Sequence, residues 1–421
     1  MFRFYSAGQL KGWLDARREE PEQLSCRPKC WFEAREWTDN SWELIRQILA
    51  VSCAPTVGFC GLKEIMPPNT LGNFVTDLHL MDTPLGYVSD ALQISGQFIQ
   101  DLTIISLVQM GNTDAAHLAG ILELGRLENI AVRLVTLIED AANILERGLA
   151  ACKGSLKSVC IGEFNDQQLR CALQGLYKGC SSTLQKLDIS CSDGNEATMM
   201  GLAALLSRED CSLTDLRLDS NRFGDKSMMA LASALRQNRS IQTLTIVHAD
   251  FGDASIPALA SALSQHRSLR RLEVSGEDVT KRGWETLFVD GVVRSEVLEE
   301  SILEDYQGDL EFMAGALASP SNLNHKLHSI LVDLEEYETH PEAWCAIEFF
   351  VDLNSCGAKT ALLWKQSPMF PISLWPLVMA RLQQITFTAT DDRRLLHDPT
   401  DEQKASRLFY TLREAASVIF T

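Results

Sequence analysis

Aliphatic residues recur along the chain in a fixed pattern: one residue, a second three positions later, and a third two positions after that. A clear copy is Leu213/Leu216/Leu218. Ten copies run from Val75 to Val332, and the steps between their first positions are 24 to 29 residues, mostly 28 or 29. Because the last two positions alternate as residues of a half-buried strand do, each copy predicts a short strand that buries one side.

A polar loop and a helical pattern follow each predicted strand. After Leu218 the chain reads DSNRFGD and then KSMMALASALRQN, whose apolar residues have helical spacing. We expect Asp225 to be the N-cap of this helix and Asp253 that of the next, where Pro257 is early enough to be tolerated. One strand and one helix cannot bury their apolar sides alone. The units must therefore stack on a continuous core and curve, because helices are wider than the strand spacing.

Residues 213–235, LTDLRLDSNRFGDKSMMALASAL, resemble a leucine-rich repeat of the long, ribonuclease-inhibitor-like class. The resemblance covers roughly residues 53–335, with a degenerate opening strand at Val57–Leu62. It implies an α/β fold: a curved solenoid, or horseshoe, of about ten repeats, with parallel strands on the concave face, helices on the convex face and helical caps.

The buried loop Asn of this family is present at Asn221 alone. The equivalent positions of other repeats hold Leu107, Val135, Phe164, Ser192, Ala249 and Glu277. We expect other groups to satisfy the buried backbone of those loops.

We expect three parts: an N-terminal helical cap at 1–52, the solenoid at 53–335 and a C-terminal capping segment at 336–421. Caps are expected because terminal repeats otherwise expose an open edge. The tail, with LNSCG, SLWP and LFYTLR, resembles the tail of uncharacterised leucine-rich repeat proteins of diatoms and related algae, which implies no known activity. A separate docking element is the alternative interpretation of this tail.

The charge of the chain restricts its partners. With 38 Lys+Arg and 56 Asp+Glu in 421 residues, the formal charge is −18, which argues against nucleic acid and anionic membranes as partners. No apolar run is long enough to span a membrane, and the N-terminal stretch lacks the apolar core of a secretory signal. The 12 Cys at irregular positions then favour reduced thiols in the cytoplasm, with the nucleus as an alternative.

Side chains that alternate with the buried aliphatics should line the concave face. The acidic positions on this map are Asp77, Asp82, Asp101, Glu163, Asp188, Asp215, Asp219, Glu273, Glu300, Glu304, Asp305 and Asp333. The basic positions are Arg133, Lys186, Arg217 and Arg271. Because a wall of one charge concentrates partners of the opposite charge, the map predicts a groove for a basic protein or peptide. The alternative is that the groove only reflects the general acidity of the chain.

Apolar side chains interleave with these charges and would supply affinity. They are Met81, Ile105, Leu134, Val247, Ile302 and Leu331. Combining charge and apolar positions, we expect the binding surface to comprise Asp188, Asp215, Arg217, Asp219, Thr245, Val247, Glu273, Glu300, Ile302 and Glu304. Arg217 should face Asp188 on the neighbouring strand and lies between Asp215 and Asp219 on its own strand, so we expect it to be an internal counter-ion.

Catalytic interpretations find little support. Cys160 should lie beside Asp188, but a neighbouring carboxylate raises the pKa of a thiol, and His248 is three repeats away. Cys26 and Cys30 form half of a possible zinc site with no second pair at usable spacing. There is no phosphate-binding glycine motif. We therefore expect no catalytic residue, metal or cofactor.

The leading hypothesis is a non-enzymatic scaffold for protein interactions. One alternative is a GTPase-activating protein of the leucine-rich repeat type, for which no catalytic residue can be matched. Another is a substrate receptor of a ubiquitin ligase, whose adaptor-binding helices would lie in residues 1–52.

Overall fold

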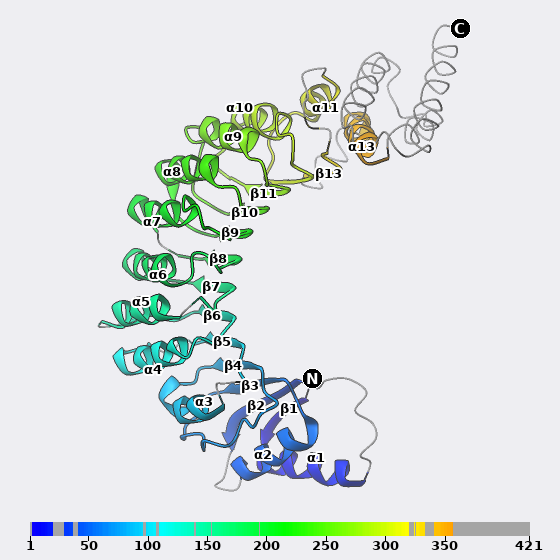
Figure 1. Ribbon diagram of the computed structural model, residues 1–421. Helices are drawn as coiled ribbons and strands as arrows, with labels where there is room; N and C mark the ends of the chain where they lie inside the picture. Colours follow the sequence, from blue (N-terminus) through cyan, green and yellow to red (C-terminus); the bar gives the residue numbers. More distant parts are fainter. Residues whose placement is uncertain are drawn as a thin grey trace, which may run out of the picture. The chain divides into compact units, whose positions relative to one another are not determined.

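The computed structural model divides into two compact units, Met1–Phe223 and Gly224–Thr421. In each unit the strands form one layer, and the helices lie against its apolar side (Figure 1). The residues that the structure describes are 2–19, 29–36, 41–95, 98–106, 109–138, 140–152, 154–192, 194–319, 324, 326–332 and 341–356.

The first unit contains parallel strands that follow one another in sequence order. They are β1 (Phe2–Ser6), β2 (Lys29–Glu36), β3 (Thr56–Cys60), β4 (Asp77–Met81), β5 (Asp101–Ile105), β6 (Asn129–Arg133), β7 (Ser158–Gly162), β8 (Lys186–Ser190) and β9 (Asp215–Asp219). The helical elements are α1 (Ala7–Glu19), α2 (Ser41–Ser52), η1 (Leu85–Tyr87), α3 (Ser89–Ser95), α4 (Asn112–Glu123), α5 (Ala141–Ala151), α6 (Asp166–Gly179) and α7 (Glu196–Leu206).

The second unit continues the same alternation. Its strands are β10 (Thr243–Val247), β11 (Arg271–Ser275), β12 (Glu300–Glu304) and β13 (Ser329–Val332). Its helical elements are α8 (Gly224–Gln237), α9 (Ile256–Gln265), α10 (Lys281–Thr286), η2 (Leu287–Val292), α11 (Leu310–Ala318) and α13 (Pro341–Cys356). Helix α13 packs against α11 and β13. Residues 357–421, with most of the predicted capping segment, lie outside the described residues.

The predicted fold class is confirmed. Each of the ten aliphatic copies corresponds to a strand, and a helical element follows every strand from β4 to β12. The repeated positions form the core between strands and helices: Leu187, Leu216 and Leu244 are fully buried. Ser301, the one polar residue in the pattern, is buried as well. Alternation therefore determined the buried side of each strand correctly.

Residues 1–52, expected to form a helical cap, contain two strands as well as two helices. β1 pairs with β2, and β2 pairs with β3 in parallel register. Aromatic residues take the buried strand positions here: the Phe4 and Phe32 rings stack 5.4 Å apart, and Phe32 and Phe59 stack 5.3 Å apart. A search for aliphatic residues does not detect such strands. The domain boundaries at 52/53 and 335/336 stay predictions.

The two predicted N-caps connect neighbouring repeats. Helix α8 begins one residue before Asp225, and α9 begins three residues after Asp253, so neither carboxylate caps its own helix. Instead, Asp225 Oδ1 accepts the Gly252 N–H at 2.9 Å, and Asp253 Oδ1 accepts the Thr280 N–H at 2.9 Å. Both N-cap predictions are therefore wrong, because these loops place the carboxylates against the following repeat.

Side chains other than Asn satisfy the loops after the strands, as expected. Asn221 is fully buried, and its Oδ1 accepts the Ser192 N–H at 3.0 Å while its Nδ2 donates to the Ile189 carbonyl at 2.8 Å. Ser192 repeats the role with a hydroxyl, accepting the Phe164 N–H at 3.1 Å and donating to the Ser190 carbonyl at 3.1 Å. Buried backbone groups thus find partners in successive repeats.

The chain turns away from the strands at one repeated position, two residues after the second strand side chain that points into the core. Gly61 adopts a φ of 65° there. Non-glycine residues adopt φ of 45° to 64° at the same position: Asp82, Leu134, Glu163, Cys191, Ser220, His248 and Asp305. Because a side chain makes this conformation sterically costly, the contacts of each repeat must hold the turn.

A second set of polar side chains satisfies the loops that lead into strands of the second unit. Each lies three residues before the first aliphatic of its repeat: Asn238, His266, Ser295 and Asn324. His266 Nδ1 accepts the Ser268 N–H at 3.3 Å and the Leu269 N–H at 3.1 Å. Burial, with help from Arg239, lowers the pKa of His266 to about 4, so the ring is neutral and can accept.

Candidate interaction surface

The strand register arranges the outward side chains in rows. We call the side of the strands that carries these side chains the strand face. In the first unit, Cys160, Asp188 and Arg217 are partners on β7, β8 and β9. In the second unit one row contains Thr245, Glu273, Ile302 and Leu331. The register thus places most of the predicted contacts side by side within each unit.

Asp188 is paired with a different cation from the one expected. It lies opposite Arg217 in the register, as predicted. However, Arg133 Nη2 donates to Asp188 Oδ2 at 3.1 Å, and Arg133 Nε donates to Cys160 Sγ at 2.9 Å. Asp188 is 8% exposed, and its Oδ1 accepts no hydrogen bond among the described residues. The long Arg133 side chain crosses β7 to reach this carboxylate, a contact that pairing between adjacent strands does not predict.

The other two predicted carboxylates of the first unit have cations of their own. Arg217 Nη2 donates to Asp219 Oδ2 at 2.6 Å, so Arg217 is an internal counter-ion as expected. Lys186 Nζ lies 3.6 Å from Asp215 Oδ2. Strands β8 and β9 therefore carry three outward carboxylates and two outward cations, and Arg133 of β6 is the third cation. The strand face is electrically balanced at this point.

The second unit has an excess of carboxylates on its strand face. Arg271 Nη1 donates to Glu300 Oε2 at 2.8 Å. Glu273 Oε2 accepts a hydrogen bond from the neutral Thr245 hydroxyl at 3.3 Å, and Glu304 lies on β12 beside Ser275. All three Glu residues are half-buried and reach solvent. Among the described outward residues of β10 to β12, acidic side chains therefore outnumber the one basic side chain, Arg271, and the face is acidic.

Two apolar side chains lie within the acidic face. Ile302 is half-buried, and Leu331, its partner in the register, is 49% exposed. Leu331 was on the map of outward positions but not among the ten residues expected at the binding surface. Its position beside Ile302 follows from strand pairing, which places equivalent residues of neighbouring repeats together.

Val247 does not contribute to this surface. It is 2% exposed, so its prediction as an exposed contact is wrong. Val247 ends β10, where the chain turns at His248 and the His248 N–H donates to the buried Ser275 hydroxyl at 2.7 Å. This bond holds the end of β10 against β11. Thr245 is also buried, at 4% exposure, and acts through its bond to Glu273.

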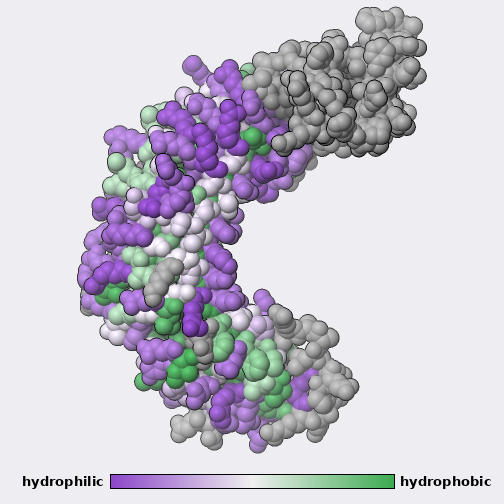
Figure 2. Space-filling model, viewed as in Figure 1, coloured by the Kyte–Doolittle hydropathy of each residue, from purple (hydrophilic) through white to green (hydrophobic). Residues whose placement is uncertain are grey.

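Exposed apolar side chains in the first unit lie elsewhere. Among the described residues they are Val51, Ile65, Phe74, Ile94, Leu124 and Met200. The space-filling view shows more hydrophobic surface around the N-terminal repeats than around α9 and α10 (Figure 2). These residues belong to loops and helices, so they do not extend the strand face.

Three cysteines, Cys160, Cys152 and Cys180, do not combine an ionised thiol with access to solvent. Burial raises the pKa of Cys160; the hydrogen bond from Arg133 opposes this rise, and the charge of Asp188 adds to it. Cys152 accepts a hydrogen bond from Cys180, which lowers its pKa to about 7, but both thiols are fully buried at the ends of α5 and α6. A reactive thiol has to be both ionised and accessible.

No group of three or more potential metal ligands occurs among the described residues, and Cys26 lies outside them. No helix in the described part of the chain is long and apolar enough to cross a membrane.

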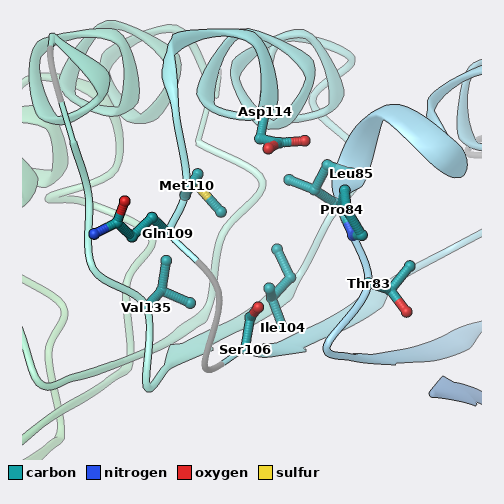
Figure 3. Close-up of a pocket in the computed structure, with 9 residues that line it drawn as sticks. All are labelled: Thr83, Pro84, Leu85, Ile104, Ser106, Gln109, Met110, Asp114 and Val135. Atoms are coloured by element: carbon teal, nitrogen blue, oxygen red, sulfur yellow. The ribbon is translucent and has the colours of Figure 1, made fainter. Parts of the chain in front are cut away.

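A cavity of about 30 Å³ lies beside the loops that follow β4 and β5, lined by Thr83, Met110 and Asp114 among others (Figure 3). Asp114 accepts the Gly86 N–H at 3.1 Å there. The cavity has room for a water molecule but not for a small-molecule ligand.

A family model described as "Leucine Rich repeat" matches residues 209–232. Among solved structures, the chain is similar to "Rad7 and Elc1 complex in yeast", with 15% identity over 78% of this chain and 84% of that chain and a TM-score of 0.45. It is also similar to "Leiomodin-1 Actin-Binding Site 2", with 15% identity over 34% of this chain and 80% of that chain and a TM-score of 0.28. No curated protein matches the sequence.

The ribonuclease-inhibitor-like subclass and the algal resemblance of the tail stay predictions. The matched segment contains β9 and the first part of α8, which correspond to the clearest copy of the sequence pattern. The match covers one repeat, and the regular alternation of parallel strands and helices is the architecture of a leucine-rich repeat solenoid.

Proposed function

We propose that the protein is a non-enzymatic interaction scaffold and that the strand face of its second unit binds a basic segment of another protein. The observation that supports this is the pair of carboxylates Glu273 and Glu300 beside the guanidinium of Arg271, which is the one cation among the described outward residues of β10 to β12. Glu304 adds a further acidic side chain to the same strand as Glu300. A basic partner is attracted to such a face and oriented by it.

The two units contribute differently to this proposal. The carboxylates Asp188, Asp215 and Asp219 have cations nearby, so they attract a basic partner less than a count of acidic residues suggests. We propose that they and Arg217 act through the geometry of their network, which selects among partners by orientation. The excess charge of the second unit supplies the attraction. Location in the cytoplasm stays a prediction of the cysteine pattern.

Affinity capture from the extract of the protein's own cells tests this function. The bait is the intact chain, compared with a variant in which Glu273, Glu300 and Glu304 are changed to Gln. The matched control is Glu277→Gln, Asp290→Asn and Glu311→Gln, which makes the same charge change in the same unit away from its strands. Each bait is used at low and at raised salt, because screening weakens exposed ion pairs.

We expect the parent and the control to capture a basic protein at low salt and the strand-face variant to lose it. Raised salt should release the same protein from both the parent and the control. Equal capture by the parent and the strand-face variant would refute the proposed surface. Thermal unfolding of all three baits is recorded as well. Equal melting temperatures would exclude a folding defect as the cause of lost capture.

A further inference from the structure

We propose that the basic segment bound by the second unit also carries a large aliphatic or aromatic side chain, which packs on Ile302 and Leu331. This inference rests on the proposed function, because it specifies the partner of the same strand face. It assigns an apolar contact to a surface that charge alone would describe only as acidic.

The geometry around Ile302 supports the inference. Glu300 and Glu304 lie two residues before and after Ile302 on β12, so all three side chains project to the same side. Glu273 and Leu331 are its partners on β11 and β13. Ile302 thus has carboxylates on three sides and an apolar neighbour on the fourth.

Leu331 provides the accessible part of this apolar pair. Its side chain is 49% exposed, whereas the aliphatic residues on the buried side of the same strand, Ile330 and Val332, are at most 9% exposed. Contact with a ligand would remove apolar surface from water, and that gain does not depend on salt. A polar basic segment would leave this surface exposed. A segment with an apolar side chain next to Lys or Arg fits both features.

Charge also argues against a second copy of this chain as the occupant. The chain has a formal charge of −18, and a copy facing its own strand face would bring Glu273, Glu300 and Glu304 towards their equivalents. Like charges brought together at an interface oppose association. The occupant that fits is therefore a segment of a different, basic protein.

Peptide selection identifies the chemistry directly. Short randomised peptides displayed on phage are selected on the full chain, and in parallel on the variant with Glu273, Glu300 and Glu304 changed to Gln. We expect the parent, and not the variant, to enrich peptides that combine Lys or Arg with Leu, Ile, Phe or Trp. Enrichment of basic peptides without apolar residues would overturn the inference and leave the proposed function standing. Failure to enrich basic peptides would overturn both.

Affinities of one enriched peptide then test the apolar contact. Fluorescence anisotropy compares the parent with Leu331→Ser, with Leu331→Met and with Phe312→Ser, which removes a side chain of 41% exposure from α11. We expect Leu331→Ser to weaken binding by about tenfold, which corresponds to about 1.4 kcal/mol, while Leu331→Met and Phe312→Ser bind nearly as well as the parent.

Salt separates the two contributions to binding. Raised salt should weaken the peptide's binding to the parent and to Leu331→Ser by the same factor, because the apolar contact is not screened. Equal affinities of the parent and Leu331→Ser would overturn the inference, with the charge variant still reporting on the proposed function. Sedimentation of the parent as a dimer and of Leu331→Ser as a monomer would overturn the proposed occupant in favour of a second copy.

Discussion

Replacement of Asn221 by Ala should destabilise the first unit strongly. The side chain is fully buried and makes two hydrogen bonds to the preceding repeat, from the Ser192 N–H at 3.0 Å and to the Ile189 carbonyl at 2.8 Å. Alanine removes both partners and leaves two buried backbone groups unsatisfied. At about 1–3 kcal/mol for each group, we expect a loss of about 2–6 kcal/mol.

This loss is large compared with the total stability of a domain, which is about 5–15 kcal/mol. Repeat proteins can unfold in parts, so a single unfolding midpoint does not locate the effect. Urea unfolding should therefore be combined with hydrogen exchange at the Ser192 amide. We expect Asn221→Ala to accelerate exchange of this amide more than that of amides in the second unit.

Two further variants define the cause. Asn221→Ser keeps a hydroxyl that can accept the Ser192 N–H, as the Ser192 hydroxyl does for Phe164, and should recover part of the stability. Asn69→Ala, in an exposed loop, should change stability by less than about 0.5 kcal/mol. A loss below about 1 kcal/mol for Asn221→Ala, with unchanged exchange at Ser192, would refute the role of this side chain.

Three other substitutions test the packing, the turns and the pH dependence of the fold. A Cβ at Gly175 would meet the Glu146 carbonyl oxygen at 2.7 Å, so urea unfolding should show that Gly175→Ala destabilises the protein by about 1–3 kcal/mol. A Cβ at Gly120 would have no atom within 4 Å, so Gly120→Ala should stabilise the protein by up to about 1 kcal/mol. Glu163 has a φ of 64°, so calorimetry should show a lower melting temperature for Glu163→Val than for Glu163→Gly; the opposite order would contradict the turn. The pKa of His266 is lowered to about 4 in the folded protein, so the unfolded chain binds the proton more readily. The free energy of unfolding of the second unit should therefore fall by up to about 3 kcal/mol as the pH falls from about 6.5 to 4. His266→Asn, which keeps an acceptor, should reduce this dependence in urea unfolding at several pH values, and an unchanged slope would exclude His266 as its source.

The sequence predicted most of the fold because its pattern reports a local property. Side chains alternate on a strand whatever surrounds it, so the aliphatic positions located each strand from β4 to β13 and its buried side. The same rule failed for β1 and β2 because it was written for aliphatic residues, and Phe4 and Phe32 fill those positions. The helix starts near Asp225 and Asp253 were also misassigned, since the exact loop path depends on the next repeat.

The binding surface could be predicted only in part. Outward positions follow from alternation, so the sequence placed Glu273, Glu300 and Ile302 on the strand face. It could not decide which charges are neutralised, because the reach of Arg133 to Asp188 across an intervening strand depends on rotamers. Nor could it show that Val247 is buried, since that depends on how the loop after β10 is held.

The sequence by itself determined the repeat length, the strand–helix alternation and the side of each strand that enters the core, because these depend on periodicity within one repeat. Only the tertiary structure decided which outward residues remain accessible and charged. Those properties depend on contacts between residues that lie 27 to 55 positions apart, such as Arg133 with Cys160 and with Asp188. Stacking of the repeats brings such residues together, and the chemistry of the strand face is set by that stacking.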